Sequence, residues 1–251
     1  MENLEQAIIG QLVADNYHTA AIFKKFNIDF CCKGNISVGE ACRQKNISPS
    51  LVTAELAGVR TAGPGAMVDY NSWGLDVLAS HIWQTHHAYV DMQIPVIKPF
   101  LHKLCSVHGS RHPELYEINK LFAETAAELT MHMKKEELML FPYIRQMAAA
   151  KLEGSACQPP VFGSVISPIA VMMHEHNQEG ERFARMTALS DDFTPPEDAC
   201  NTYRVTYGLL KEFRDDLHLH IHLENNILFP KAVIMEESMR GAGESYSVER
   251  R

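Results

Sequence analysis

The chain has 251 residues, 46% of them hydrophobic and 22% charged, a balance typical of a globular protein that can bury a sizeable core. Its net charge of −8 argues against nucleic acid as a partner, because phosphate binding needs a face rich in lysine and arginine. No apolar run approaches the roughly 18 residues that span a bilayer, so we expect no membrane association.

The start of the chain and its cysteines predict a cytoplasmic protein. The first ten residues lack the basic start and long apolar core of a signal peptide. The six cysteines show neither a disulfide-framework spacing nor a CxxC pair, which fits a reducing compartment. The sequence leaves open whether the protein is a monomer or a homodimer.

Two domains are expected along the chain. Residues 1–62 consist of short helical stretches separated by turns, and they include the adjacent cysteines Cys31 and Cys32. Residues 61–65, Thr-Ala-Gly-Pro-Gly, have the composition of a linker. We therefore predict a small N-terminal helical domain over 1–62 and a second domain over 72–240.

The second domain contains four long segments with helical periodicity, near residues 75–104, 113–150, 166–187 and 206–231. Pro95 and Pro99 should kink or break the second half of the first segment. The fold class predicted for the whole chain is all-α, with a four-helix bundle after the N-terminal domain.

A duplicated motif is the most informative feature of these segments. The pattern HxxxExxxLFP occurs at 132–142 and again at 220–230. Positions i and i+4 share a helix face, so each copy directs a histidine and a glutamate toward one point. Single histidines, His86 and His176, precede the two copies at similar distances. Such a repeat predicts a bundle with pseudo-two-fold symmetry.

The repeated residues have the chemistry of a dinuclear metal site. A single buried histidine is ordinarily a hydrogen-bonded core residue, and a single HxxxE motif is ordinarily a surface ion pair. Buried carboxylates in duplicated register instead require a compensating cation. Imidazole and carboxylate donors without thiolate suit iron or manganese better than structural zinc. The predicted ligands of two iron ions are His86, His132, Glu136, His176, His220 and Glu224.

Several other residues are alternatives or additions to this ligand set. His87 could replace His86 if the helix were rotated. Glu128 and Glu175 are either solvated acids or outer carboxylates that guide metal or relay protons. His174 competes less well with His176. Six other histidines are expected at the surface or outside the ligand set: His18, His102, His108, His112, His218 and His222. The cysteines beyond the adjacent pair have no motif context: Cys42, Cys105, Cys157 and Cys200.

These motifs resemble those of the repair of iron centres family, the di-iron proteins that repair iron-sulfur clusters. Residues 29–34, Asp-Phe-Cys-Cys-Lys-Gly, are similar to its N-terminal DYCC motif. The two HxxxE segments and Glu175-His176 are similar to its hemerythrin-like motifs. The resemblance covers nearly the whole chain. It implies a hemerythrin-like bundle with an oxo- or hydroxo-bridged di-iron centre, held by the six residues above.

The resemblance also implies a function, namely restoring iron-sulfur clusters damaged by nitric oxide or peroxide by supplying iron to the damaged proteins. Glu128, Glu175, Cys31 and Cys32 would be functional groups outside the ligand set. The cysteines would form a redox-active or iron- or nitrosyl-accepting dithiol, with Lys33 favouring thiolate, unless they are only structural. Two alternatives stay open. One is nitric oxide reduction at the di-iron site, and the other is a binding protein that senses oxygen or iron.

Overall fold

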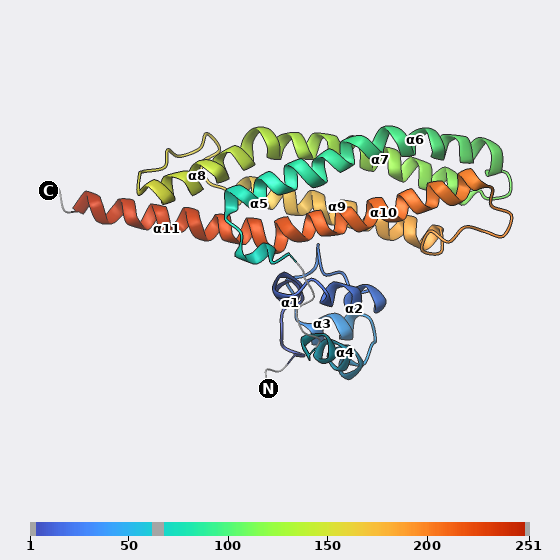
Figure 1. Cartoon of the computed structure of the whole chain (residues 1–251), viewed down its shortest axis with the longest axis horizontal. Coiled ribbons are helices and arrows are strands. Elements are labelled where there is room, and N and C mark those ends of the chain that lie inside the picture. The colour runs from blue at the N-terminus through green and yellow to red at the C-terminus, as the bar shows by residue number, and fades with distance from the viewer. Residues whose placement is uncertain (1–3, 62–67, 249–251) are drawn as a thin grey trace. The chain divides into compact units, whose positions relative to one another are not determined.

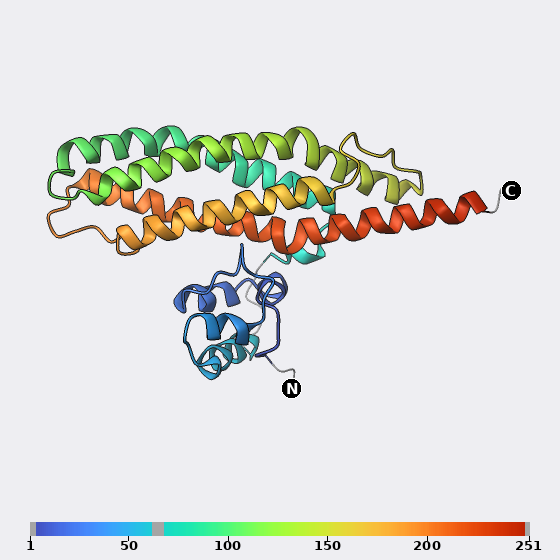
Figure 2. The same cartoon turned by 180° about the vertical axis from the view of Figure 1, so that it is seen from behind.

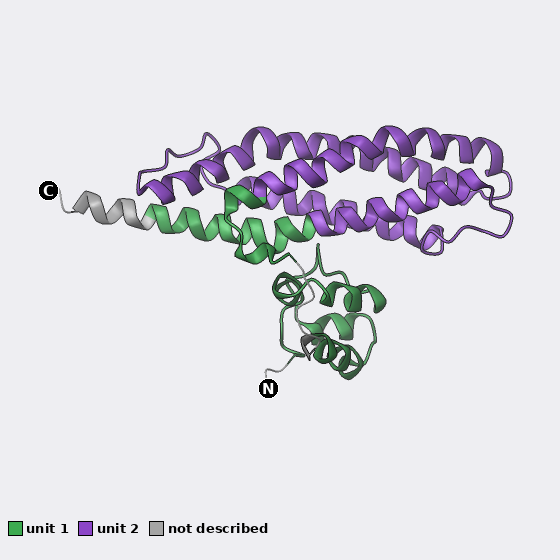
Figure 3. Cartoon of the chain, in the orientation of Figure 1, with its two compact units in different colours: residues 1–78, 221–251 green, residues 79–220 purple. Residues whose placement is uncertain are grey.

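The computed structural model describes residues 4–61 and 68–248. These residues form helices and no strand, with one isolated antiparallel bridge between Ile8 and Ser37. The predicted all-α class is confirmed. The chain divides into two compact units, residues 1–78 with 221–251 and residues 79–220 (Figure 3). Most of the expected linker at 61–65 lies outside the described residues, and the domain limits 1–62 and 72–240 stay a prediction.

Short helices build the N-terminal part of the first unit. They are α1 (Ile9–Asp15), α2 (Thr19–Lys25), α3 (Val38–Gln44) and α4 (Pro49–Thr61), followed by a 3₁₀ turn (Tyr70–Ser72) and α5 (Leu75–His81). Pro49 opens α4, a position where the missing N–H of proline costs nothing. Ser37 caps α3 by accepting a hydrogen bond from the backbone N–H of Glu40.

Within the first unit, the turn before the cysteines is fastened to the segment after residue 221. The side-chain amides of Asn225 and Asn226 donate to the backbone oxygens of Cys31 and Phe30, at 3.2 Å each. A Cβ at Gly10 would lie 2.2 Å from the Asn226 Oδ1 atom, so a larger residue there would force the Asn226 side chain to move. These contacts hold the cysteine turn in one place.

The second unit is a bundle of four long helices, which lie side by side in both views (Figures 1 and 2). Its elements are a π-helical segment (Ile82–His87), α6 (Ala88–His108), α7 (Glu114–Lys135), a second π-helical segment (Glu136–Leu140), α8 (Phe141–Glu153), α9 (Ile166–Leu189) and α10 (Asn201–Leu223). The chain of α10 continues through a third π-helical segment (Glu224–Leu228) into α11 (Phe229–Val248).

An aromatic layer ties the four helices of the bundle together. Phe213 of α10 is fully buried, and its ring centroid lies 5.4 Å from that of Phe122 in α7 and 5.8 Å from that of Phe183 in α9. Tyr89 of α6 completes the layer at 6.1 Å. The burial of such rings contributes much of the stability of a core.

Of the two outcomes predicted for the prolines of the first bundle helix, a break does not occur. Pro95 and Pro99 both lie inside α6, which runs without interruption from Ala88 to His108. Each proline removes one backbone hydrogen bond, but packing against α7 holds the helix together.

Candidate metal centre

Both copies of the HxxxE motif end in a π-helical segment that starts at the glutamate. In each copy the N–H of the following phenylalanine donates to the carbonyl oxygen of the glutamate five residues earlier, Phe141 to Glu136 and Phe229 to Glu224. The proline after each phenylalanine has no N–H to give the carbonyl four residues before it, which favours a wider turn. The Leu-Phe-Pro part of the motif therefore explains the π-helical segment that begins at each glutamate.

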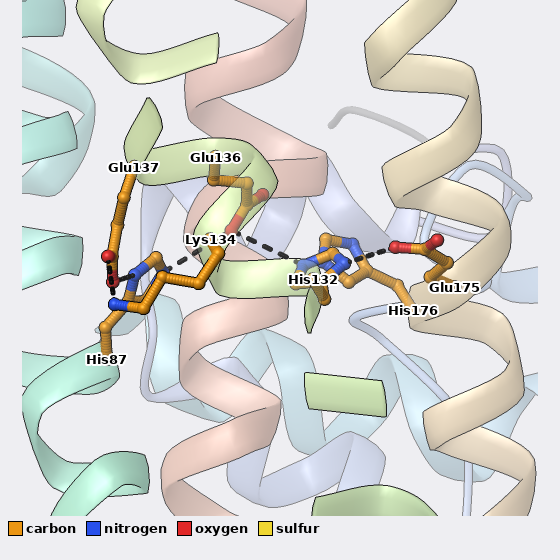
Figure 4. Close-up of polar contacts among 7 residues, drawn as sticks. All are labelled: His87, His132, Lys134, Glu136, Glu137, Glu175 and His176. Atoms are coloured by element: carbon orange, nitrogen blue, oxygen red, sulfur yellow. Dashed lines mark hydrogen bonds and ion pairs between the residues drawn. The ribbon is translucent and has the colours of Figure 1, made fainter. Parts of the chain in front are cut away.

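His132, Glu136 and His176 form one potential ligand group, called here the His132 group. The Nε2 atoms of His132 and His176 are 3.0 Å apart, and His132 Nε2 is 3.4 Å from Glu136 Oε2. All three side chains are buried. Figure 4 shows His132 between Glu136 and Glu175, with the ring of His176 beside it. Two donors at about 2.1 Å from one ion and at right angles are about 3.0 Å apart, so this spacing fits a shared cation.

His87, Glu136 and His220 form a second group, the His87 group. His87 Nε2 lies 3.4 Å from Glu136 Oε2, and the ring centroids of His87 and His220 are 4.9 Å apart. In each group the potential ligand atoms lie within 4.8 Å of one another, and the side chains are buried. One oxygen of Glu136 thus faces a histidine of each group, an arrangement suited to two neighbouring cations.

The structure brings His87, and not the predicted His86, into the ligand groups. His86 is also buried, but its Nδ1 atom lies 2.9 Å from Asp216 Oδ1, and its ring stacks on that of His220 at 5.6 Å. Regular α-helical periodicity would direct His86 toward the centre. The π-helical segment Ile82–His87 changes the rotation per residue just before α6, so the neighbouring histidine faces the centre.

Glu224 completes the second copy of the motif. Its side chain is fully buried. It follows His220 by four residues in an uninterrupted helical chain, as Glu136 follows His132. The common spacing puts Glu224 on the same helix face as His220.

An outer layer of carboxylates orients two of the histidines. His132 donates from Nδ1 to Glu175 Oε2 at 2.8 Å, and Lys135 pairs with the same carboxylate. His87 donates from Nδ1 to Glu137 Oε1 at 3.0 Å, and Lys134 Nζ lies 2.5 Å from Glu137 Oε2 (Figure 4). With the proton held at Nδ1, each imidazole leaves Nε2 to face the centre as a lone-pair donor.

Of the two outer carboxylates, Glu175 was predicted from the sequence and Glu137 was not. A hydrogen bond from His132 is the largest influence that lowers the pKa of Glu175 to about 2, against the opposing effect of partial burial. Glu175 is therefore a carboxylate throughout the physiological range. Glu137 was not singled out, although its position next to Glu136 in a buried motif is a signal that could have found it.

Glu128 lies at a cavity of about 320 Å³ that reaches His132. Its side chain is half exposed and forms a 2.5 Å ion pair with Arg182. Glu175 and Glu179 also line the cavity. Glu179 was missed by sequence reasoning, and burial raises its pKa. The cavity thus brings three carboxylates, together with Lys135, beside a potential ligand.

The adjacent cysteines form a compact group with Asp29 in the first unit. The Cys31 and Cys32 sulfurs are 3.7 Å apart, and Asp29 Oδ1 accepts from both backbone N–H groups, at 3.0 and 2.9 Å. The pKa of Cys31 is raised well above its usual value, chiefly by the hydrogen bond with Cys32 and then by burial. The expectation that Lys33 favours thiolate is therefore wrong for Cys31.

Histidine and glutamate side chains gathered inside a helical bundle define a class of cation-binding protein. Residues 78–232 match the hemerythrin HHE cation binding domain, and residues 5–60 match ScdA_N, a domain of unknown function. Within residues 4–61 and 68–248, none of the helices combines the length and apolar character needed to cross a membrane.

Curated relatives narrow this class to a family. The iron-sulfur cluster repair protein YtfE of Musicola paradisiaca is 32% identical over 225 residues, which cover 90% of this chain and 95% of that protein. The protein of the same name from Escherichia coli O157:H7 is 32% identical over 228 residues, covering 91% and 97%. The chain belongs to the family of these YtfE proteins.

Proposed function

We propose that the centre holds two iron ions through six side chains: His87, His132, Glu136, His176, His220 and Glu224. Glu136 supports this proposal most directly, because one of its oxygens lies 3.4 Å from an imidazole nitrogen of each group. Glu224 is proposed as the second shared carboxylate, from its equivalent place in the repeat. His87 takes the place that the sequence argument gave to His86.

The donor set favours iron as the bound metal. Both groups offer imidazole nitrogen and carboxylate oxygen, whereas structural zinc sites generally use thiolates. Bound iron would supply redox chemistry and open coordination positions for an oxygen bridge or a small external ligand. Glu175 and Glu137 keep the imidazoles oriented, and their lysine partners offset the carboxylate charge.

We infer that the protein repairs iron-sulfur clusters damaged by nitric oxide or peroxide, in the cytoplasm, by supplying iron to the damaged proteins. The names of the relatives support the repair role. The acidic cavity that ends at His132 supports the supply of iron, because carboxylates such as Glu128 and Glu175 can accept a cation as it leaves.

Cys31 and Cys32 are proposed to take part as a dithiol rather than as an isolated thiolate. The raised pKa of Cys31 keeps its proton at neutral pH, so its thiol can donate toward the neighbouring sulfur 3.7 Å away. Asp29, Cys31 and Cys32 could together receive a cation that displaces the Cys31 proton, since their ligand atoms lie within 4.8 Å of one another.

The test is a repair assay with an iron-sulfur dehydratase inactivated by nitric oxide. The iron-loaded protein should restore dehydratase activity while losing iron in proportion. His132→Ala and Glu224→Ala should lose both iron and repair, whereas Lys120→Ala, at an exposed position of α7, should keep both. The double variant Cys31→Ala/Cys32→Ala should retain iron but repair less.

The same assay separates the alternatives. Sustained consumption of nitric oxide with an electron donor, without iron loss, would instead identify a nitric oxide reductase. Stable reversible oxygenation without repair would identify a sensing or binding protein. Full repair by His132→Ala would refute the proposed role of the centre.

A further inference from the structure

A second histidine site lies at the other end of α6, where the helix meets the start of α10. His108 was expected at the surface, but its side chain is only 4% exposed. Its Nε2 atom lies 3.2 Å from the sulfur of Cys200, a cysteine without motif context. The 21 residues of α6 separate His108 from His87, which is about 30 Å along the helix axis. The pair is therefore distinct from the metal centre.

The hydrogen-bonding of His108 indicates where its proton lies. The Nδ1 atom of its ring has no hydrogen-bond partner among the residues that the structure describes. A buried N–H without an acceptor is rare and costly, so a neutral ring keeps its proton on Nε2. The imidazole then presents an N–H group to the Cys200 sulfur, and such a donor stabilises negative charge on sulfur.

The backbone at Cys200 also stabilises negative charge on its sulfur. Cys200 directly precedes α10, and its carbonyl oxygen accepts a hydrogen bond from the N–H of Arg204 at 3.1 Å. It therefore occupies the N-cap position of a helix of 23 residues. The positive end of the helix dipole favours a thiolate at this place. The cysteine is also exposed, so solutes can reach it.

A carboxylate close to Cys200 in the sequence is already paired. Asp198, two positions before Cys200, is engaged by Arg111 at 2.9 Å and by His112 Nε2 at 2.9 Å. The hydrogen bond from His112 is the main reason why the pKa of Asp198 is lowered. The other ring nitrogen of His112 lies 3.2 Å from Glu114 Oε1. The ring of Tyr203 packs edge-on against both histidines and keeps them in place.

We propose that Cys200 is a nucleophilic thiol that forms a mixed disulfide with low-molecular-mass disulfides of the glutathione type. Ionisation of Cys200 releases the thiol proton to solvent, and the His108 N–H stabilises the thiolate. The thiolate attacks one sulfur of the small disulfide, whose sulfur–sulfur bond breaks as the protein–glutathione bond forms. The second half leaves as a thiolate and takes a proton from water, so no further oxidant is needed.

The experiment measures mixed-disulfide formation at each cysteine of the iron-loaded full-length protein. Oxidised glutathione is added at pH 7, and the modified peptides are quantified by mass spectrometry over time. Cys157 serves as the control within the same molecule, because it lies in the connection between α8 and α9 and not at a helix start. We expect Cys200 to react at least about tenfold faster than Cys157.

Two variants test the part played by His108. His108→Leu removes the N–H donor and should slow Cys200 about tenfold while Cys157 is unchanged, whereas His108→Gln offers an amide N–H and should restore part of the rate. Equal rates for Cys200 and Cys157 in the unsubstituted protein would overturn the proposal, even if a variant failed to fold. An unchanged Cys200 rate in folded His108→Leu would overturn it as well.

Discussion

Replacing His87 by alanine should cost the proposed two-iron centre one ion. The substitution removes a buried imidazole whose Nε2 atom lies 3.4 Å from the carboxylate that both groups share. Loss of an outer partner of a metal ligand typically weakens binding by about 10- to 100-fold, so loss of the ligand itself should exceed about 100-fold. That factor corresponds to more than about 2.7 kcal/mol for the affected ion.

His86→Ala is the matched control for this substitution. His86 is the adjacent residue and is equally buried, but it contacts Asp216 and stacks on His220. We expect it to weaken metal binding less than tenfold, with a loss of stability of about 1–3 kcal/mol from its broken hydrogen bond.

The assay is iron content per chain after equilibration with a competing chelator, with circular dichroism as the check on folding. The unsubstituted protein and His86→Ala should hold about two ions, and His87→Ala about one. The reasoning would be refuted if folded His86→Ala lost an ion while His87→Ala kept both.

Three further predictions concern the surroundings of the centre and the core. Glu175→Gln should weaken iron binding about 10- to 100-fold, because the acceptor that orients His132 becomes a neutral amide; unchanged affinity in a chelator titration would contradict this. Burial lowers the pKa of His222 to about 4, whereas its pKa in the unfolded chain is about 6.5. The stability that the neutral ring contributes above pH 6.5 should therefore be lost as the pH falls toward 4. In urea unfolding of the metal-free protein, the free energy of unfolding should fall by about 2 kcal/mol between pH 7 and pH 5. The His222→Gln variant should not show this fall. Phe213→Ala should destabilise the bundle by about 3–5 kcal/mol, and a change below about 1 kcal/mol would contradict its place in the aromatic layer.

The sequence was sufficient for the architecture because the repeat carries both periodicity and chemistry. Each HxxxE motif fixes two residues on one helix face, and the duplication requires the two faces to meet in a shared core. His132 could therefore be placed beside Glu136, and His220 beside Glu224, from spacing alone, whereas the pairing of His132 with His176 is visible only in the structure. The choice between His86 and His87 could not, because it depends on a π-helical segment whose effect on rotation no regular period describes.

The burial of a residue by distant segments of the chain could not be predicted from the sequence either. His222 was expected to be exposed or outside the ligand set, yet it is buried against Tyr17 and Phe30 of the same unit. His108 belongs to no motif, and its hydrogen-bond partner Cys200 lies 92 positions later. Such contacts follow from packing between segments, which local pattern does not report.

The most direct test of the central claim is anomalous X-ray diffraction at the iron edge from crystals of the iron-loaded protein. We predict two iron peaks, one beside His132 and His176 and the other beside His87 and His220, with Glu136 between them. A single peak, peaks outside the bundle core, or a peak bound by His86 in place of His87 would contradict the account.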